Sequence, residues 1–135
     1  ANLENALRLQ ANSFKSRVLL NTNGNFSNID LPYEAQFSSI NDFVIEDYNG
    51  DGLKDILAIG NLFTSEIETP RNDASNGILL IGKGDGSFYT KLRKESGFYA
   101  PSDAKKIIPL KIKNENGILV GNNNDLLQYF KAIKP

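Results

Sequence analysis

The sequence predicts an all-β protein built from short antiparallel strands, and three observations support this prediction. Short runs rich in β-branched, leucine and aromatic residues recur along the whole chain. Glycine, asparagine and aspartate, which tolerate the positive φ angles of tight hairpins, separate most of these runs. No segment keeps a helical hydrophobic period over about ten residues or more.

The predicted hairpins follow one another in chain order. SRVLL leads through NTNGN into FSNIDL, and DFVIE leads through DYNGDGLK into DILAIGN. GILLIG leads through KGDGS into FYTKL, KKIIPLKIK leads through NENG into ILVGN, and NNND precedes a last run, LLQYF. The N-terminal LENALRLQ fits either one helical turn or an alternating strand. The long connection from Leu62 to Asn76 has no period, which is typical of a functional or a mobile loop.

Composition limits the functions that the chain can have. Its 135 residues carry 15 Lys and Arg, 16 Asp and Glu, and 40% hydrophobic residues, as expected for a single domain, residues 1–135, with its own core. The net charge of −1 gives no electrostatic basis for binding nucleic acid or an anionic membrane. Without cysteine or histidine, zinc fingers, thiol catalysis and histidine-dependent acid–base catalysis are excluded.

No part of the sequence predicts a membrane segment or a leader. No apolar run approaches the roughly 20 residues that span a bilayer. The start, ANLENALRLQ, lacks the basic and apolar regions of a signal peptide, which leaves open a removed signal or a longer parent chain.

An internal repeat is visible in the spacing of several landmarks. VLLNTNGNF resembles LLIGKGDGSF, each with an apolar strand, a glycine-rich turn and then Phe26 or Phe88. Asp42 and Asp103 are separated by the same length of chain as Gly60 and Gly121. The alternative is that generic β-hairpins look alike. A period of roughly 60 residues with four antiparallel strands is typical of a propeller blade.

The repeat predicts three units along the chain. Residues 1–31 form the end of one blade, residues 40–95 a complete blade, and residues 102–135 a degenerate terminal blade. About two to two and a half blades are too few to close a ring of about four to eight blades. The chain is therefore predicted to be a fragment or terminal part of a β-propeller.

The stretch DYNGDGLKD gathers oxygen donors at alternate positions. Calcium prefers about six to eight oxygen ligands, and a short loop supplies them from alternate side chains and a backbone carbonyl. The sequence therefore predicts a calcium site whose ligands are Asp47, Asn49, Asp51, the carbonyl of Leu53, and Asp55.

A β-hairpin calcium loop has two alternatives. An EF-hand would require glutamate where Ala58 stands, and helices where the flanking runs are strand-like. A metal-free turn rich in Asp and Asn is the second alternative, but three carboxylates repel one another and a plain turn does not need them.

The other turns of the chain are predicted to be free of metal. KGDGS offers only Asp85, NTNGN offers no carboxylate, and KNENG keeps only Glu115. NNND, from Asn122 to Asp125, is interpreted as a turn. Four aromatic residues offer sugar-stacking surfaces, but packing is the commoner role of such residues in β-sheets: Tyr89, Phe98, Tyr99 and Tyr129.

These motifs resemble a known family. DFVIEDYNGDGLKDILAIGN followed by GILLIGKGDGSF is similar to the FG-GAP/VCBS repeat of integrin-α-like β-propellers. The order RNDASNGILLIG, ESGFYAPSD, NNNDLLQYFK resembles the C-terminal end of VCBS-repeat proteins of Bacteroidetes, many of them exported and carrying an ASPIC/UnbV-type segment. The resemblance runs from Val18 to Lys131 and implies the same five calcium ligands.

Three functions remain open. The first is a calcium-binding, non-enzymatic module outside the cytoplasm, extracellular, periplasmic or on the cell surface, that contacts protein or glycan. The second is a purely structural terminal part of a larger propeller. The third is a carbohydrate-active enzyme that uses an acid pair from Glu66, Glu68 and Asp73. Unpaired blade edges also predict strand exchange between copies, or a flattened sandwich.

Overall fold

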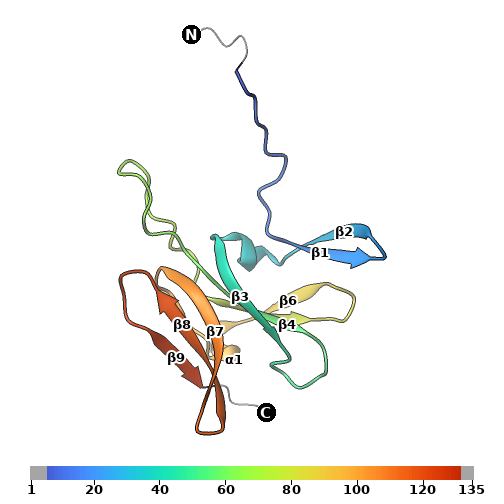
Figure 1. Cartoon of the computed structure of the whole chain (residues 1–135), viewed down its shortest axis with the longest axis vertical. Helices are drawn as coiled ribbons and strands as arrows, with labels where there is room; N and C mark the ends of the chain where they lie inside the picture. The colour runs from blue at the N-terminus through green and yellow to red at the C-terminus, as the bar shows by residue number, and fades with distance from the viewer. Residues whose placement is uncertain (1–5, 132–135) are drawn as a thin grey trace.

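The computed structural model describes residues 6–131, which form three antiparallel sheets and confirm the all-β prediction (Figure 1). A two-stranded sheet comes first, a four-stranded sheet second and a three-stranded sheet last. None of these sheets closes on itself. In chain order the elements are β1 (Arg17–Thr22), β2 (Asn25–Asp30), η1 (Tyr33–Gln36), β3 (Ile40–Glu46), β4 (Asp55–Gly60), β5 (Ile78–Gly82), β6 (Phe88–Lys91), α1 (Arg93–Ser96), β7 (Ala104–Ile112), β8 (Glu115–Asn122) and β9 (Gln128–Lys131).

Two hairpins turn on pairs of residues with positive φ. Asn23 and Gly24 have φ values of 52° and 86° between β1 and β2, which is the backbone of a type I′ turn. Lys113 and Asn114 do the same between β7 and β8, at 46° and 68°. The predicted turn NENG is therefore wrong in position, because β8 already begins at Glu115.

The N-terminal segment forms neither of the two structures expected for it, a helical turn or a strand. Residues 6–16 have no regular structure and extend away from the sheets (Figure 1). Leu7, Leu9 and Phe14 are 84%, 85% and 92% exposed, so the segment buries no apolar surface. The first residues of LENALRLQ, and the predicted domain limits at residues 1 and 135, lie outside the described residues.

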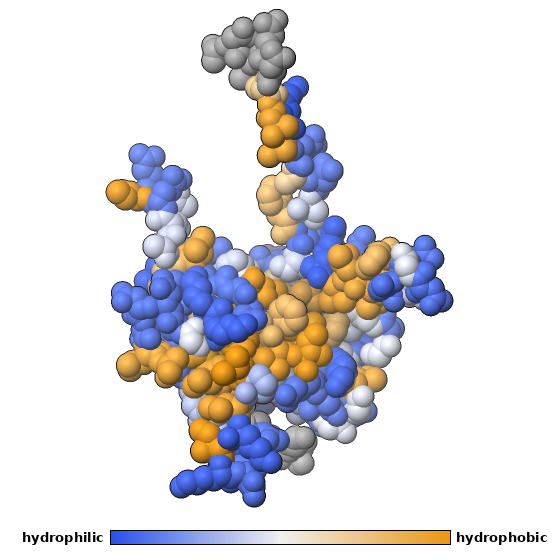
Figure 2. Space-filling view, viewed as in Figure 1, coloured by the Kyte–Doolittle hydropathy of each residue, from blue (hydrophilic) through white to orange (hydrophobic). Residues whose placement is uncertain are grey.

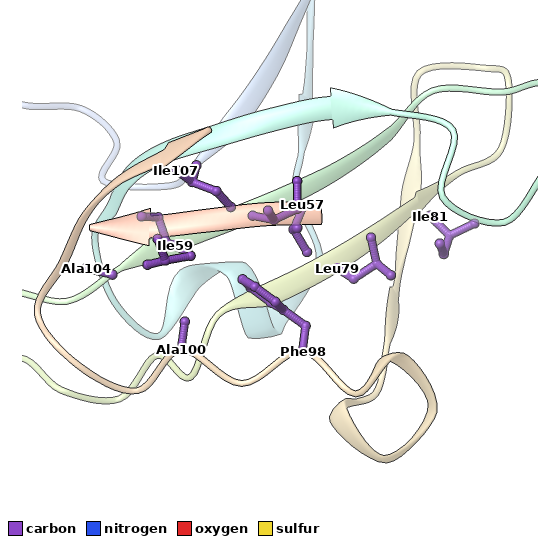
Figure 3. Close-up of a cluster of buried hydrophobic side chains, with 10 residues drawn as sticks. Leu57, Ile59, Leu79, Ile81, Phe98, Ala100, Ala104 and Ile107 are labelled. Carbon is purple, nitrogen blue, oxygen red and sulfur yellow. The ribbon is translucent and has the colours of Figure 1, made fainter. Parts of the chain in front are cut away.

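The hydrophobic core lies between the second and third sheets (Figure 3). The four-stranded sheet contributes alternate residues of two strands, and the last sheet adds residues of β7 and β8. Phe98, on the connection between the sheets, packs against Phe130 with ring centroids 4.7 Å apart and the rings tilted by 59°. The buried aliphatic members are Leu57, Ile59, Leu79, Ile81, Ala100, Ala104, Ile107, Ile118 and Val120.

Polar contacts also join the second and third sheets. Asp42 on β3 accepts a hydrogen bond of 2.9 Å from the backbone N–H of Ile107 and forms an ion pair with Lys106. Asn61, which is fully buried, donates its side-chain amide to the carbonyls of Ser75 and Pro101. These bonds hold the ends of the sheets in register.

The hairpins β3–β4 and β7–β8 share two local features. Each has a register shift near its start, between Ile40 and Asp42 in β3 and between Ala104 and Lys106 in β7. The N–H of Asn61 donates to the carbonyl of Ser39, and that of Asn123 donates to Asp103 in the same way.

These shared features place the two hairpins in a register that differs from the predicted spacing. They relate Ser39 to Asp103 and Asn61 to Asn123. In agreement with this, the partner of Ile40 is Gly60, whereas the partner of Ala104 is Asn122. Corresponding residues of the first strands, β3 and β7, are therefore separated by a different length of chain than corresponding residues of the second strands, β4 and β8. The predicted repeat instead matches Asp42 with Asp103, and Gly60 with Gly121, at one shared spacing.

Candidate functional site

The predicted calcium loop connects β3 to β4. Glu46 pairs with Asp55 at the base of the hairpin, and the intervening residues leave the sheet. Gly50 and Gly52 have φ values of 81° and 83°, a conformation that strains residues with a β-carbon. The two glycines therefore produce the bend that the sequence predicted.

Asp47 organises the first half of the loop. One carboxylate oxygen accepts a hydrogen bond of 2.6 Å from the N–H of Gly50, and the other accepts one of 3.0 Å from the N–H of Gly52. The Gly52 N–H is the main reason why the pKa of the Asp47 carboxyl lies below its usual value. Both bonds favour the ionised carboxylate.

Asn49 and Asp51 bind each other on the exposed part of the loop. The Asn49 amide donates to Oδ2 of Asp51 at 2.8 Å, and its oxygen accepts from the Asp51 N–H at 3.0 Å. Oδ1 of Asp51 accepts from the N–H of Leu53 at 2.8 Å. The side chain of Leu53 lies towards Gly84 on the neighbouring loop.

Asp55 is fully buried at the base of the loop. Its Oδ2 accepts a hydrogen bond from the N–H of Tyr48, and its Oδ1 accepts one from the N–H of Gly82 on β5, both at 2.9 Å. A β-carbon at Gly82 would clash with the carbonyl oxygen of Lys54, so only glycine allows this approach. Asp55 thereby ties the loop to the third strand of the sheet.

Tyr48 lies under the same loop. Its hydroxyl is buried without a hydrogen-bond partner among the described residues. Burial, together with the negative charges of Glu46 and Asp55, raises the pKa of the Tyr48 hydroxyl, which stays protonated.

The five predicted ligands lie on one loop, but their carboxylates do not converge. In residues 6–131 no three acidic, histidine or cysteine side chains are placed to hold a metal together. The oxygens of Asp47, Asp51 and Asp55 instead face N–H groups of the loop and of β5. To share an ion, these side chains would have to exchange some of these hydrogen bonds for metal contacts.

The chemistry of the loop nevertheless fits a hard cation. The donors are carboxylate and amide oxygens, which calcium prefers. Within the described chain none of the three carboxylates forms an ion pair, whereas Asp30, Asp42, Asp73 and Asp103 all do. The loop therefore concentrates negative charge that no lysine or arginine of residues 6–131 neutralises.

A second Gly-Asp-Gly turn joins β5 to β6. Gly84 and Gly86 have φ values of 84° and 86°, and Asp85 accepts from the N–H and the hydroxyl of Ser87 at 2.8 and 2.6 Å. Ile81 and Lys83 stand where the first loop has Asp47 and Asn49. This turn has the same bend without the additional acids.

The acids considered for catalysis lie on an exposed connection. The connection from Leu62 to Asn76 forms a protruding hairpin closed by a bridge between Leu62 and Asn72 (Figure 1). Glu66 accepts a hydrogen bond from Thr69, and Asp73 forms an ion pair with Arg71. Glu66, Glu68 and Asp73 are all exposed, and nothing encloses them.

The four aromatic residues differ in their surroundings. Phe98 is 7% exposed in the core, and Tyr99 lies beneath the Arg93 guanidinium, 3.4 Å from the ring centre. Tyr129 covers Gly117, and Tyr89 lies near the ammonium of Lys83.

Sequence reasoning missed two structural features. The first is Gly82, which donates to Asp55 from a strand 27 residues further along, so no local spacing signals it. The second is a cavity of about 290 Å³ between the protruding hairpin and the β8–β9 turn. The NNND motif was the one signal for this cavity, which is lined by Phe63, Thr64, Asp103, Asn123, Asn124 and Asp125.

Comparison of the chain with protein-family models, curated proteins and solved structures found no match. Among residues 6–131 no helix is long and apolar enough to cross a membrane.

Proposed function

We propose that the chain is a calcium-binding, non-enzymatic module of the FG-GAP/VCBS propeller type that contacts protein or glycan outside the cytoplasm. One observation carries the calcium part of this proposal. Three carboxylates and an asparagine stand at alternate positions of one short loop, and none of the carboxylates pairs with a cation in the described chain. Such a concentration of charge is costly unless a counter-ion joins it.

The second Gly-Asp-Gly turn supports the proposal. It reaches the same backbone conformation with Asp85 as its single carboxylate. The additional acids of the first loop are therefore not needed for bending the chain. Binding of an ion gives them a physical role.

Each ligand has a position that suits this role. Asp47, Asn49, Asp51 and the Leu53 carbonyl would surround the ion from the loop, and Asp55 would hold it from below. Asp55 is already anchored to Gly82, so a bound ion would connect the loop to β5 as well as to β4. Calcium supplies charge neutralisation here, and the chain supplies the fixed loop, so metal binding adds to folding stability.

Calcium titration with two matched variants tests this function. Isothermal calorimetry and thermal unfolding should show binding and a rise in Tm of about 5 °C or more at saturating calcium. The variant Asp51→Asn should weaken binding by at least about tenfold, because it removes one charged ligand. The variant Asp85→Asn changes the same position of the second turn and should bind like wild type.

Two outcomes would overturn the calcium assignment. One is a wild-type protein whose heat signal and Tm do not respond to millimolar calcium. The other is an equal loss of affinity in the variants Asp51→Asn and Asp85→Asn, because the effect would then not be specific to the first loop.

The cavity next to the protruding hairpin supports the contact function. Asp103, only 1% exposed, lines it together with the amides of Asn123 and Asn124, and Phe63 provides an aromatic surface. Carboxylates, amides and an aromatic ring are the groups that recognise sugars or polar peptide segments. At the tip of the hairpin, Ile67 is fully exposed, which suits insertion into a partner.

Chemical-shift mapping tests the contact surface. A panel of neutral oligosaccharides should shift the amide signals of Asn123 to Asp125, and the variant Asn123→Ala should abolish the shifts. If neither oligosaccharides nor polar peptides shift these signals, the cavity is not the contact site.

A further inference from the structure

Two apolar residues of β3 remain on the surface. Phe43 and Ile45 are 54% and 50% exposed, whereas Val44 between them packs against the core. Alternation along a strand places Phe43 and Ile45 on the face of the four-stranded sheet opposite the core. We call these two residues the N-face. In the view of Figure 2 apolar surface gathers at the centre of the body, where Figure 1 draws β3.

The β1–β2 hairpin covers only the outer part of the same face. Its residues Leu20 and Ile29 reach Gly86, where a β-carbon would clash with the end of the Leu20 side chain and lie 3.1 Å from that of Ile29. The hairpin therefore packs at the β5–β6 end of the sheet. The chain before it extends away (Figure 1). Ala58, the partner of Phe43 on β4, is buried within the chain, whereas Phe43 and Ile45 on the edge strand β3 stay about half exposed among residues 6–131.

A second apolar face lies on the three-stranded sheet, on the side opposite the core. Ile108 on β7 is paired with Leu119 on β8, which is paired with Tyr129 on β9. Ile108 and Tyr129 are each 40% exposed, whereas the adjacent Ile107 is buried in the core at 2%. We call the row of Ile108, Leu119 and Tyr129 the C-face.

The contact between the second and third sheets shows how two such faces pack together. The matching bulges and closing hydrogen bonds relate Val44 to Ile108 and Leu57 to Leu119. Val44 and Leu57 belong to the core contact, so the C-face repeats the surface that the four-stranded sheet buries.

The same correspondence relates the N-face to the other side of the core. It matches Phe43 to Ile107, which is the residue that the third sheet buries against the second. Ile45 matches Pro109, which is exposed, so of the two N-face residues it is Phe43 that corresponds to a residue buried in the contact between the second and third sheets.

We propose that a second copy of this chain docks its C-face on the N-face of the first, in a head-to-tail contact. A second copy is the expected partner because of the contact inside each copy. There, Ile107 packs on a surface of the four-stranded sheet, and the C-face corresponds to that surface. The contact stacks one sheet on another and exchanges no strand. It is heterologous, so each copy keeps one free face and further copies can add. The contact does not depend on calcium.

Sedimentation velocity tests the contact with two face variants. Wild type should form dimers and larger species as its concentration rises to hundreds of micromolar, with and without calcium. Phe43→Ser with Ile45→Ser removes the N-face, and Ile108→Ser with Tyr129→Ser removes the C-face. Each double variant should lose affinity for itself by at least about tenfold, because apolar burial drives the contact.

Mixing the two variants provides the decisive measurement. One variant keeps an intact C-face and the other an intact N-face, so the mixture should form a 1:1 dimer that does not grow. A variant of two exposed residues outside both faces, Leu9→Ser with Phe14→Ser, should associate like wild type. Circular dichroism and Tm confirm that each variant folds.

Two results would overturn the proposal. A wild-type protein that stays monomeric at these concentrations would show that the N-face is not covered by a second copy and is left for another segment or partner. A mixture of folded variants that stays monomeric while wild type associates would show that other surfaces make the contact. Loss of calcium binding alone changes neither result, so the two proposals are tested separately.

Discussion

The loops β3–β4 and β5–β6 have the same bend but different chemistry. Both contain Gly-Asp-Gly with all four glycines at φ between 81° and 86°. In both, the central aspartate accepts a hydrogen bond of 2.8 Å from the N–H two residues later. The first loop adds Asp47, Asn49 and Asp55, whereas the second has Lys83 and Ser87 near its aspartate.

The second loop shows which residues the bend requires. Two glycines and one carboxylate are sufficient for the bend, because the second loop reaches it with Asp85 as its single acid. The additional oxygen donors of the first loop are therefore not needed for the bend, although Asp47 and Asp55 bind N–H groups of the loop and of β5.

The largest difference is expected at the base of the first loop. Replacing Asp55 with alanine leaves the N–H groups of Tyr48 and Gly82 without their acceptors in a buried position. In the presence of a chelator, the free energy of unfolding should fall by about 2–4 kcal/mol, as measured by urea denaturation. Asp85→Ala, on the exposed second loop, should have a much smaller effect. Equal effects would show that Asp55 has no special structural role.

The glycines should respond alike in the two loops. Gly50→Ala and Gly84→Ala each force a β-carbon into the left-handed region, which should cost about 1–2 kcal/mol. A β-carbon at Gly84 meets only the end of the flexible Leu53 side chain, at 3.3 Å, and one at Gly50 meets nothing. Urea denaturation of both variants measures the difference. A cost in one loop alone would show that the bends are not equivalent.

The smallest effect concerns titration. The pKa of Asp47 and that of Asp85 both lie below the usual 3.8, mainly because of the Gly52 N–H and the Ser87 hydroxyl respectively. A lowered pKa stabilises the fold above the unfolded value, and this contribution disappears as the pH falls through the folded pKa.

Carboxyl NMR measures both titrations. In a chelator, both midpoints should lie below 3.8. Calcium should move the midpoint of Asp47 further towards acid, because protons then compete with the ion, and should leave that of Asp85 unchanged. A calcium shift of equal size at Asp85 would contradict the assignment of the ion to the first loop.

Much of the secondary structure was predictable because it depends on neighbouring residues. The strands around DYNGDGLKD and KGDGS were found from their apolar runs and their Gly-Asp-Gly turns. The β7–β8 turn was misplaced because Lys113 adopts positive φ, while the more obvious Gly117 lies within β8 beneath Tyr129. Glycine there serves side-chain packing, which the local sequence does not reveal.

Local sequence accounts for the hairpins and the acidic loop, because strand and turn preferences act over a few residues. Packing between distant segments accounts for the anchoring of Asp55 by Gly82, the register in which the hairpins correspond, and the exposure of apolar residues on β3 and β7. These features depend on how sheets stack. Stacking is set by contacts between residues far apart in the chain, which local spacing does not encode.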